Sequence, residues 1–381
     1  MGAAVRRITA IARKEFVHIS RDWRMIVTVL VMPLFQLLLF AYAISFDVRN
    51  VPTIVLDQDQ TTASRAYVNA AGKSGFFRLE GAVADQTAID RAFDRNVARV
   101  AIVVSRGYSD AIAAGGKGRV AVLVDGSEPN SAQLGKAYAV ALNNLLTRQT
   151  LVTWANARGL SLTGIGMLEP RIRDWYNPER RSADFLIPGL MVVIIMIVTV
   201  QQTAVTLVKE RESGTLEQMT ESPLRQYELI LGKVLPWAIL GFVDTLAITV
   251  VSLLVFHVPL RGDVTVLVAG MFLFIVCSLS IGLVISAAAP SIESANLVGL
   301  LIAFLPGFML SGLAFPLGSI PPALQVISCL FPARYMVEIA RGVFLRGTGW
   351  DVLGVQVLWL GLYATIGLGL ATVLNRRSER T

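Results

Sequence analysis

The sequence predicts a polytopic α-helical membrane protein with an α/β domain inserted between its first two membrane spans. Three observations support this fold class. Of the 381 residues, 54% are hydrophobic and 16% are charged, and the mean hydropathy is +0.61, whereas soluble proteins carry about a quarter charged residues. Six segments are apolar over the roughly 20 residues that a spanning helix needs. A long segment of mixed polarity, residues 47–181, separates the first of them from the second.

The first expected span is preceded by a charged segment, and the other five follow residue 181. The "AYA" of residues 41–43 resembles a signal-peptide cleavage site. The long charged segment before it and the apolar run beyond it favour a retained span. The fifth span is the weakest, because Pro306 and two glycines interrupt it. The expected spans are Met25–Phe46, Asp184–Val208, Leu229–Phe256, Thr265–Ala288, Ala295–Leu317 and Val352–Leu374.

Basic residues at both ends of the chain indicate its orientation. The tail carries Arg376, Arg377 and Arg380, and six cations precede the first span: Arg6, Arg7, Arg13, Lys14, Arg21 and Arg24. Segments that flank spans on the cytoplasmic side are enriched in Lys and Arg, and six spans place both ends on one side. Both termini are therefore expected in the cytoplasm, and the net charge of +7 requires no nucleic-acid partner.

Residues 1–24 are predicted to form an amphipathic helix. One helical face collects apolar residues at steps of three and four, namely Val5, Ile8, Ala12, Phe16, Ile19 and Trp23. The basic residues fall elsewhere around the helix. This pattern favours a helix lying in the cytoplasmic headgroup layer and contacting the lipid bilayer, and a helix packed against protein is the alternative.

The segment 47–181, about 135 residues, is long enough for a small domain and is expected on the extracytoplasmic side. Strands that alternate with helices indicate an α/β layer. We expect strands at Val51–Asp57, Phe76–Val83, Arg99–Val104 and Arg119–Asp125, and helices at Thr62–Lys73, Gln86–Asn96, Gly107–Ala114 and Ser131–Ala157.

The chain is not expected to hydrolyse ATP or to hold a metal. Gly72-Lys73-Ser74 matches only the end of a phosphate-binding loop, because Tyr67 occupies the position five residues earlier where the motif needs glycine. No other such loop occurs in the sequence. The two cysteines and the two histidines lie far apart and without metal-ligand spacing.

A pair of short helices is expected at about 318–346, between the fifth and sixth spans. Pro322 opens the first helical stretch, and Pro332 separates it from the second. Each piece is too short to span, which favours a re-entrant or interfacial pair, with a solvated external hairpin as the alternative. Arg334, Glu338 and Arg341 are spaced to form ion pairs along one helix face.

The charged hinge "LVKERESGTLEQMTESPLRQYELILGK", residues 207–233, lies between the second and third spans. Thr215 with Gln218 forms a capping box, so a short helix is expected at about 215–222. Pro223 ends it, and Gly214 permits a sharp turn from the second span. An exposed face with Glu217 and Glu221 around Leu216 and Met219 favours docking of a partner over a flexible linker.

Two segments resemble ABC transporter permeases of the type-2 exporter class. "KERESGTLEQMTESPLRQYELILGK" is similar to the signature segment of that family, and "MLSGLAFPLGSIPPALQVISCLFPARYMVEIARGVFLRG" is similar to its second signature. The span order, the N-terminal helix and the large external domain match as well. The resemblance covers essentially the whole chain and is strongest for the bacterial drug- or ion-efflux subfamily.

The resemblance implies partners and site residues. Members of the family pair with a second permease, either a copy or a sister chain, and with a separate cytoplasmic ATPase dimer that binds ATP and Mg²⁺. A periplasmic adaptor is a further candidate partner, and the bacterial inner membrane is the expected location. The ATPase-coupling residues would be Glu210, Gly214, Thr215, Leu216, Glu217, Gln218 and Pro223. The re-entrant gate would include Gly312, Pro316, Pro322, Pro332, Arg334 and Glu338.

Asp244 lies near the middle of the third expected span. A charge there costs about 2.5–3.5 kcal/mol on insertion scales, so it must be paired, protonated or facing a polar path. A place in the translocation path with Gln201 and Gln202 is one interpretation, and a structural hydrogen bond to one of these glutamines is the other.

Two other classes of function fit parts of the sequence. A secondary transporter usually needs more ionisable residues within its spans than this chain offers. A membrane-anchored sensor would need no translocation path. The exporter is the favoured interpretation, and its substrate stays open among drugs, lipid-like molecules, ions and peptides.

Overall fold

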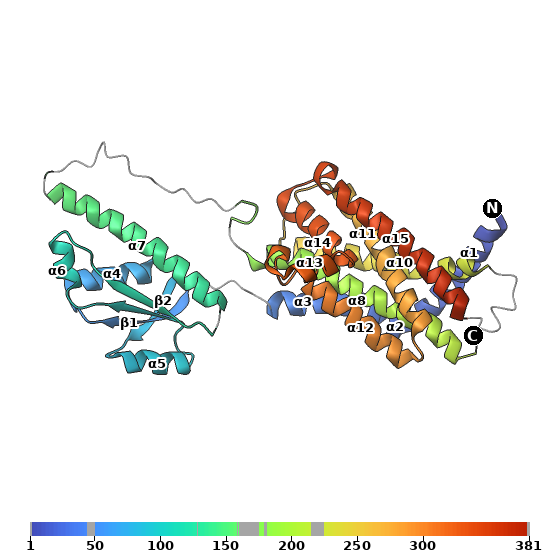
Figure 1. The fold of residues 1–381 in the computed structure, drawn as a ribbon, viewed down its shortest axis with the longest axis horizontal. Helices are drawn as coiled ribbons and strands as arrows, with labels where there is room; N and C mark the ends of the chain where they lie inside the picture. The colour runs from blue at the N-terminus through green and yellow to red at the C-terminus, as the bar shows by residue number, and fades with distance from the viewer. Residues whose placement is uncertain are drawn as a thin grey trace. The chain divides into compact units, whose positions relative to one another are not determined.

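The computed structural model describes residues 2–43, 50–127, 129–157, 159, 175–178, 181–214 and 225–378. The chain divides into two compact units. One unit comprises residues 46–173, and the other combines residues 1–45 with residues 174–381. Figure 1 shows an α/β layer in the first unit and a bundle of helices in the second.

The α/β unit contains a four-stranded sheet in the order β2-β1-β3-β4. Strand β1 pairs in parallel with both β2 and β3, and β4 runs antiparallel to β3. Every strand and helix expected between residues 51 and 157 is present, with ends that differ by no more than two residues. The elements are β1 (Val51–Asp57), α4 (Thr62–Lys73), β2 (Phe77–Ala82), α5 (Gln86–Asp94), β3 (Val100–Val104), α6 (Tyr108–Ala113), β4 (Val120–Val124) and α7 (Pro129–Ala157).

Side chains alternate across this sheet, so β1, β3 and β4 each contribute to two separate cores. Val51 and Val55 face a cluster completed by Tyr67 of α4 and Leu142 of α7. Ile54 and Leu56, which lie at the intervening positions of β1, belong to a second cluster with Ile89 of α5. Burial on both faces explains why β1 and β3 are almost wholly apolar.

Six helical segments of the second unit are long and apolar enough to cross a membrane. The first, Trp23–Ala43, combines α2 (Trp23–Ile26), the π-helical turn η1 (Val27–Val31) and α3 (Met32–Ala43). The others lie in α8 (Ser182–Glu212), α10 (Gln226–Leu254), α11 (Val264–Ala288), α12 (Ile292–Met309) and α15 (Trp350–Ser378). The polytopic helical class expected from the sequence is therefore correct.

The fifth span ends earlier than expected. Helix α12 stops at Met309 and not at Leu317. Gly312 adopts a left-handed backbone conformation, with φ of +88°, and helices commonly end where glycine adopts this conformation. Arg341 then binds the freed carbonyls, with Nη1 donating to Gly312 at 2.8 Å and Nη2 to Leu313 at 3.3 Å.

A bent pair of helices follows this turn. The 3₁₀ turn η2 (Leu317–Ser319) leads into α13 (Pro322–Ser328), which is followed by α14 (Pro332–Arg341) and the π-helical turn η3 (Gly342–Arg346). The two parts, Pro322–Ser328 and Pro332–Arg346, are bent by 88° relative to each other. Pro322 and Pro332 each stand in the first turn of their helix, where the missing N–H leaves no bond unmade.

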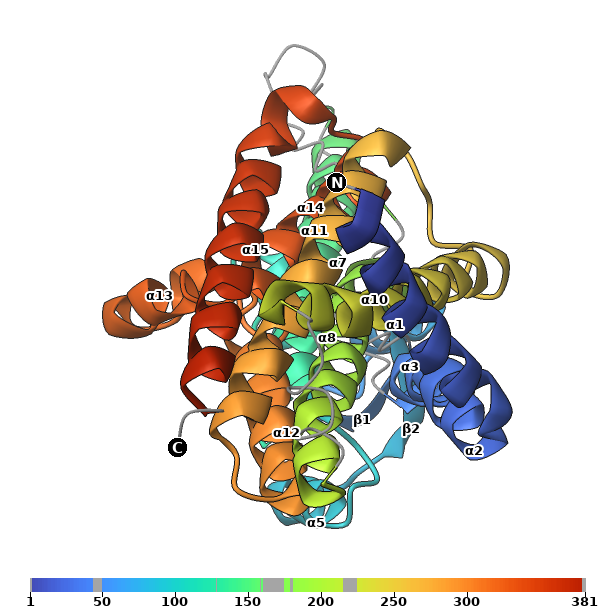
Figure 2. The same ribbon diagram turned by 90° about the vertical axis from the view of Figure 1, so that its right-hand side faces the viewer.

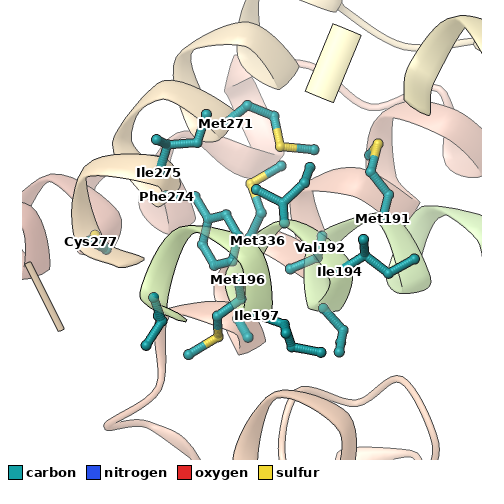
Figure 3. Packing of buried hydrophobic residues seen from close by; sticks show 14 of the residues in the cluster. Met191, Val192, Ile194, Met196, Ile197, Met271, Phe274, Ile275, Cys277 and Met336 are labelled. Atoms are coloured by element: carbon teal, nitrogen blue, oxygen red, sulfur yellow. The ribbon is translucent and has the colours of Figure 1, made fainter. Parts of the chain in front are cut away.

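Helix α8 forms the centre of the membrane unit. Its side chains are buried along nearly the whole apolar length, and Figure 2 shows it among the other helices, with α15 and α1 (Gly2–Arg21) to either side. Figure 3 shows Met191 and Met196 of α8 in one cluster with Phe274 of α11 and Met336 of α14. Because these side chains fill the interior, α8 can shift little without displacing its neighbours.

Helix α1 packs against α10 along part of its surface. A Cβ atom on Gly232 of α10 would lie 2.7 Å from Cβ of Ile11, so this glycine permits close approach. Ala12 and Ile19 are buried, whereas Phe16 and Trp23 are exposed. Contact with protein, the alternative left open by the sequence, therefore accounts for part of the apolar face. The exposed aromatic side chains remain available to a membrane surface.

The contact between α8 and α11 requires a glycine, which gives a first prediction. A Cβ on Gly282 would lie 2.6 Å from the carbonyl oxygen of Val200 and 2.7 Å from Cβ of Thr203. Gly282→Ala should therefore destabilise the protein by about 1–3 kcal/mol through overpacking, seen as a lower midpoint of thermal unfolding in detergent.

Gly354→Ala in α15 is the matched control, because a Cβ there meets nothing within 4 Å. Its midpoint should be unchanged or slightly raised, since alanine favours a helix over glycine. Equal midpoints for the two variants would contradict the close packing of α8 on α11.

Candidate functional site

The charged end of α8 forms ion pairs and hydrogen bonds with several neighbouring helices. The helix runs to Glu212, and Ser213 caps it by donating its backbone N–H to the carbonyl of Lys209 at 3.0 Å. Gly214 follows with φ of +69°, a left-handed conformation that favours glycine. Gly214 thus has the backbone conformation that the expected turn needs, while the chain that follows lies outside the described residues.

Three consecutive residues of this end bind three different helices. Glu210 forms an ion pair with Lys233 of α10, whose side chain is 1% exposed. Arg211 donates through Nη2 to the carbonyls of Ser286 and Ala289 at the end of α11. Glu212 accepts from the backbone N–H of Ile292, the first residue of α12, at 2.9 Å.

The signs of these charges match the helix ends that they meet. The carbonyl end of α11 carries partial negative charge and receives the guanidinium of Arg211, whereas the N-terminus of α12 carries partial positive charge and receives the carboxylate of Glu212. The end of α8 is thus tied electrostatically to α10, α11 and α12. A displacement applied to this end would be transmitted to all three helices.

A second ion pair connects α1 to the beginning of α10. Nε of Arg7 lies 3.3 Å from Oε2 of Glu228, whose side chain is fully buried. The same oxygen accepts the backbone N–H of Arg225, the N-cap residue of α10, at 3.1 Å. Both ends of the hinge are therefore anchored to neighbouring helices.

The central hinge residues lie outside the described residues. Thr215, Leu216, Glu217, Gln218 and Pro223 belong to the stretch 215–224, so their coupling role stays a prediction. Glu210 and Gly214 lie directly before it. Because α8 ends at Glu212 and α10 begins at Gln226, the Glu210–Lys233 pair joins the two helices that this stretch connects.

The residues of the second signature lie around the bent helix pair. Gly312 and Pro316 flank the turn after α12, and Pro322 and Pro332 begin α13 and α14. Arg334 donates through Nη1 to the carbonyl of Gln325 at 3.0 Å and also contacts the Ser328 hydroxyl.

The expected ion pairs within this helix are wrong. The side chain of Glu338 is exposed, and Arg334 and Arg341 bind backbone carbonyls in preference to it. Arg341 also lies over the ring of Phe185, with Cζ 3.9 Å from the ring centroid. Its guanidinium therefore joins α14 to the start of α8 and to the turn after α12.

Asp244 is buried within α10, with 3% of its surface exposed. Two contacts of α10 show which part of α8 lies beside Asp244. Gly241 packs against Thr199, and the Thr249 hydroxyl contacts the sulfur of Met191 at 3.6 Å. Asp244 therefore lies beside the part of α8 between Met191 and Thr199. Within the described residues its Oδ1 has no hydrogen-bond partner.

The two glutamines lie nearer the charged end of α8. Gln201 donates to the side-chain oxygen of Asn296 in α12 at 3.1 Å. Gln202 lines a cavity with residues of α1 and α10. The structural hydrogen bond considered between Asp244 and these glutamines is not among the contacts of the described residues.

Lys233 and Arg211 were not singled out from the sequence as site residues. The sequence does contain a signal for Lys233: it is a charged residue within the expected third span, and a buried charge requires a partner. The paired charges just after the second span could have supplied that partner. Arg211 gave no comparable signal, since its acceptors are backbone carbonyls.

Comparisons with known proteins were made on the whole chain. A family model described as "ABC-2 family transporter protein" matches residues 23–373. The chain is 28% identical to the "Probable multidrug ABC transporter permease YbhS" of Escherichia coli (strain K12), over 98% of this chain and 97% of the relative. It is 22% identical to the "Probable multidrug ABC transporter permease YbhR" of that strain, over 97% and 99%. It is 28% identical to its "Inner membrane transport permease YhhJ", over 83% and 84%.

The buried ion pair between α8 and α10 gives a second prediction. Lys233→Met removes the cation beside Glu210, and losing one partner of a buried pair costs about 3–5 kcal/mol. The double variant Glu210→Gln/Lys233→Met should lose less stability than the sum of the single variants. Urea unfolding in detergent would measure the coupling. Strictly additive losses would contradict a direct interaction between the two side chains.

Proposed function

Because the chain belongs to the ABC-2 family of transporter proteins, we propose that the charged end of α8 couples this exporter permease to a separate ATPase. The chain is the membrane subunit of an ABC exporter. The observation that supports the coupling role is the binding of Glu210, Arg211 and Glu212 to α10, α11 and α12. The hinge helix expected at 215–222 directly continues this end.

The proposed mechanism depends on the rigid connection of the end of α8 to α10, α11 and α12. An ATPase dimer that closes on ATP and Mg²⁺ would displace the hinge segment, and the Glu210–Lys233 pair would carry this displacement into α8 and α10 together. Arg211 and Glu212 would extend it to α11 and α12. Coupling of this kind requires a structural element with two arrangements, whose balance both sites can shift. Helix α8 is the proposed element, because it extends from the hinge at one end to Arg341 and the turn after α12 at the other.

Nucleotide binding belongs to the partner and not to this chain. Gly72-Lys73-Ser74 lies at the C-terminal end of α4, whereas phosphates bind at helix N-termini. Tyr67 is buried and donates its hydroxyl to Asn143 at 2.5 Å. These three residues therefore lack the loop and the helix terminus that phosphate binding needs.

We place both termini and the hinge in the cytoplasm and the α/β unit outside the bacterial inner membrane. Figure 1 supports a common side for the termini, because α1 begins and α15 ends at the same end of the membrane unit as the C-terminal end of α8. This end also carries the basic residues. The α/β unit would then offer a periplasmic adaptor the exposed side chains of Val140, Leu145 and Leu151 on α7.

The proposed substrate is a drug-like or lipid-like apolar molecule or an ion, moved outward through a dimer of permeases. The names of two relatives, both called probable multidrug permeases, support drug efflux. Asp244, with Gln201 and Gln202 nearer the cytoplasm, is the proposed polar part of the path, and Gly312, Pro316, Arg334 and Glu338 are proposed at its outer gate.

Charge reversal on the hinge tests the docking role. Glu217→Arg should prevent a cytoplasmic ATPase from co-purifying with the tagged permease, or abolish its stimulation, because it replaces an anion on the proposed contact face. Glu293→Arg is the matched control, since Glu293 is an exposed anion in the first turn of α12. Normal recruitment and stimulation in Glu217→Arg would refute the assignment.

Asp244→Asn tests the proposed path. It keeps the size of the side chain but removes the carboxylate, so efflux by the intact complex should fall by about tenfold or more while the ATPase remains bound. Removing an interaction of about 1.4 kcal/mol corresponds to that factor. Unchanged efflux would assign Asp244 a structural role only.

A further inference from the structure

A cavity of about 260 Å³ lies among α1, α2, α8 and α10, next to the charged end of α8. Lys14, Glu15 and His18 reach it from α1, Lys209 from α8 and Trp237 from α10. The cavity is large enough for a group of several heavy atoms, since one water needs only about 10–15 Å³ of probe-occupied space. It adjoins the Glu210–Lys233 ion pair, because Glu210 is one of its lining residues.

Three charged side chains of the cavity lining have no partner among the described residues. Lys14, Glu15 and Lys209 form no hydrogen bond or ion pair there, whereas Glu210, which also lines the cavity, is paired with Lys233. Trp237 is buried and contributes an aromatic wall. The cavity thus offers two cations and one carboxylate.

These groups match a phosphate together with an ammonium. Lysine ammonium groups bind phosphate oxygens, and the carboxylate of Glu15 accepts hydrogen bonds from a primary ammonium. A quaternary ammonium would instead favour a cage of several aromatic rings, and Trp237 is the one aromatic side chain of the cavity lining.

The position of the cavity indicates the source of this ligand. Ile19, Met25 and Val205 line it as well, so apolar and charged walls meet there. It lies where the apolar part of α8 gives way to its charged end, which is the level of lipid headgroups. A free phosphate ion would bind the two lysines, but it would make no favourable contact with the carboxylate of Glu15 or with the apolar wall.

We propose that this cavity binds the headgroup of a cytoplasmic-leaflet phospholipid that carries a primary ammonium, such as phosphatidylethanolamine. Lys14 and Lys209 hold the phosphate, and Glu15 receives the ammonium. Ser213 and Glu210 line the same cavity, so the bound headgroup fixes the turn from α8 into the hinge. The inference rests on the proposed orientation, and its effect on coupling rests on the proposed function.

Native mass spectrometry of the full permease tests the binding. The protein would be released from nanodiscs made of equal parts phosphatidylethanolamine and phosphatidylglycerol. Wild type should retain phosphatidylethanolamine in preference to phosphatidylglycerol, and Lys14→Gln/Lys209→Gln should reduce the retained fraction about tenfold, since two charge-assisted contacts are lost. Glu15→Gln should abolish the preference between the two lipids.

A further variant controls for an effect of misfolding. Arg13→Gln removes a neighbouring exposed cation of α1 that does not line the cavity, and it should retain lipid as wild type does.

Equal retention by wild type and the double lysine variant would overturn the proposal, as would equal retention of the two lipids by wild type. Displacement of the lipid by inorganic phosphate would assign the site to a soluble anion. A wild type that shows no lipid preference but recruits the ATPase normally would refute this inference alone. A Glu217→Arg variant that recruits and stimulates the ATPase normally, in a protein whose lipid retention follows the pattern above, would refute only the proposed function.

Discussion

The membrane unit depends on pairing the charges that the second span carries beyond its apolar length. Glu210, Arg211 and Glu212 extend α8 past the apolar residues, and each meets a group of opposite charge on a neighbouring helix. The Glu210–Lys233 pair is largely buried, and leaving either of these two charges unpaired would be costly. The pairing stabilises the bundle and fixes how the end of α8 is oriented relative to α10, α11 and α12.

Packing makes this end part of one rigid unit. The interior side chains of α8, including Met191 and Met196, interdigitate with those of α11 and α14, and Gly282 allows α11 to approach closely. At the opposite end of α8, Arg341 covers Phe185 and binds the turn after α12. A force at the hinge therefore acts on a connected body that reaches the helix pair of the second signature.

Local sequence patterns predicted most of the fold, because the relevant interactions are close in sequence. Strand β1 and helix α4 begin and end as expected, since a continuous apolar run defines the strand and the Thr61 cap begins the helix. The end of the fifth span was missed because it depends on Arg341, which binds Gly312 from 29 residues away. The predicted ion pairs of Glu338 are absent for a similar reason. Arg334 and Arg341 donate instead to backbone carbonyls outside their own helix. At the site, the sequence alone indicates a turn at Gly214. The role of Lys233 could not be predicted in the same way, because it depends on the contact between α8 and α10.

The most direct test of the account is a pair of spin-label distances in the complete transporter. Labels on Ser213 and Glu293, two exposed residues at the ends of α8 and α12, report on one chain, and labels on Ser213 of two copies report on their separation. ATP binding should leave the distance within the chain unchanged and should alter the distance between chains. A change within the chain, with no change between chains, would contradict transmission through a rigid α8.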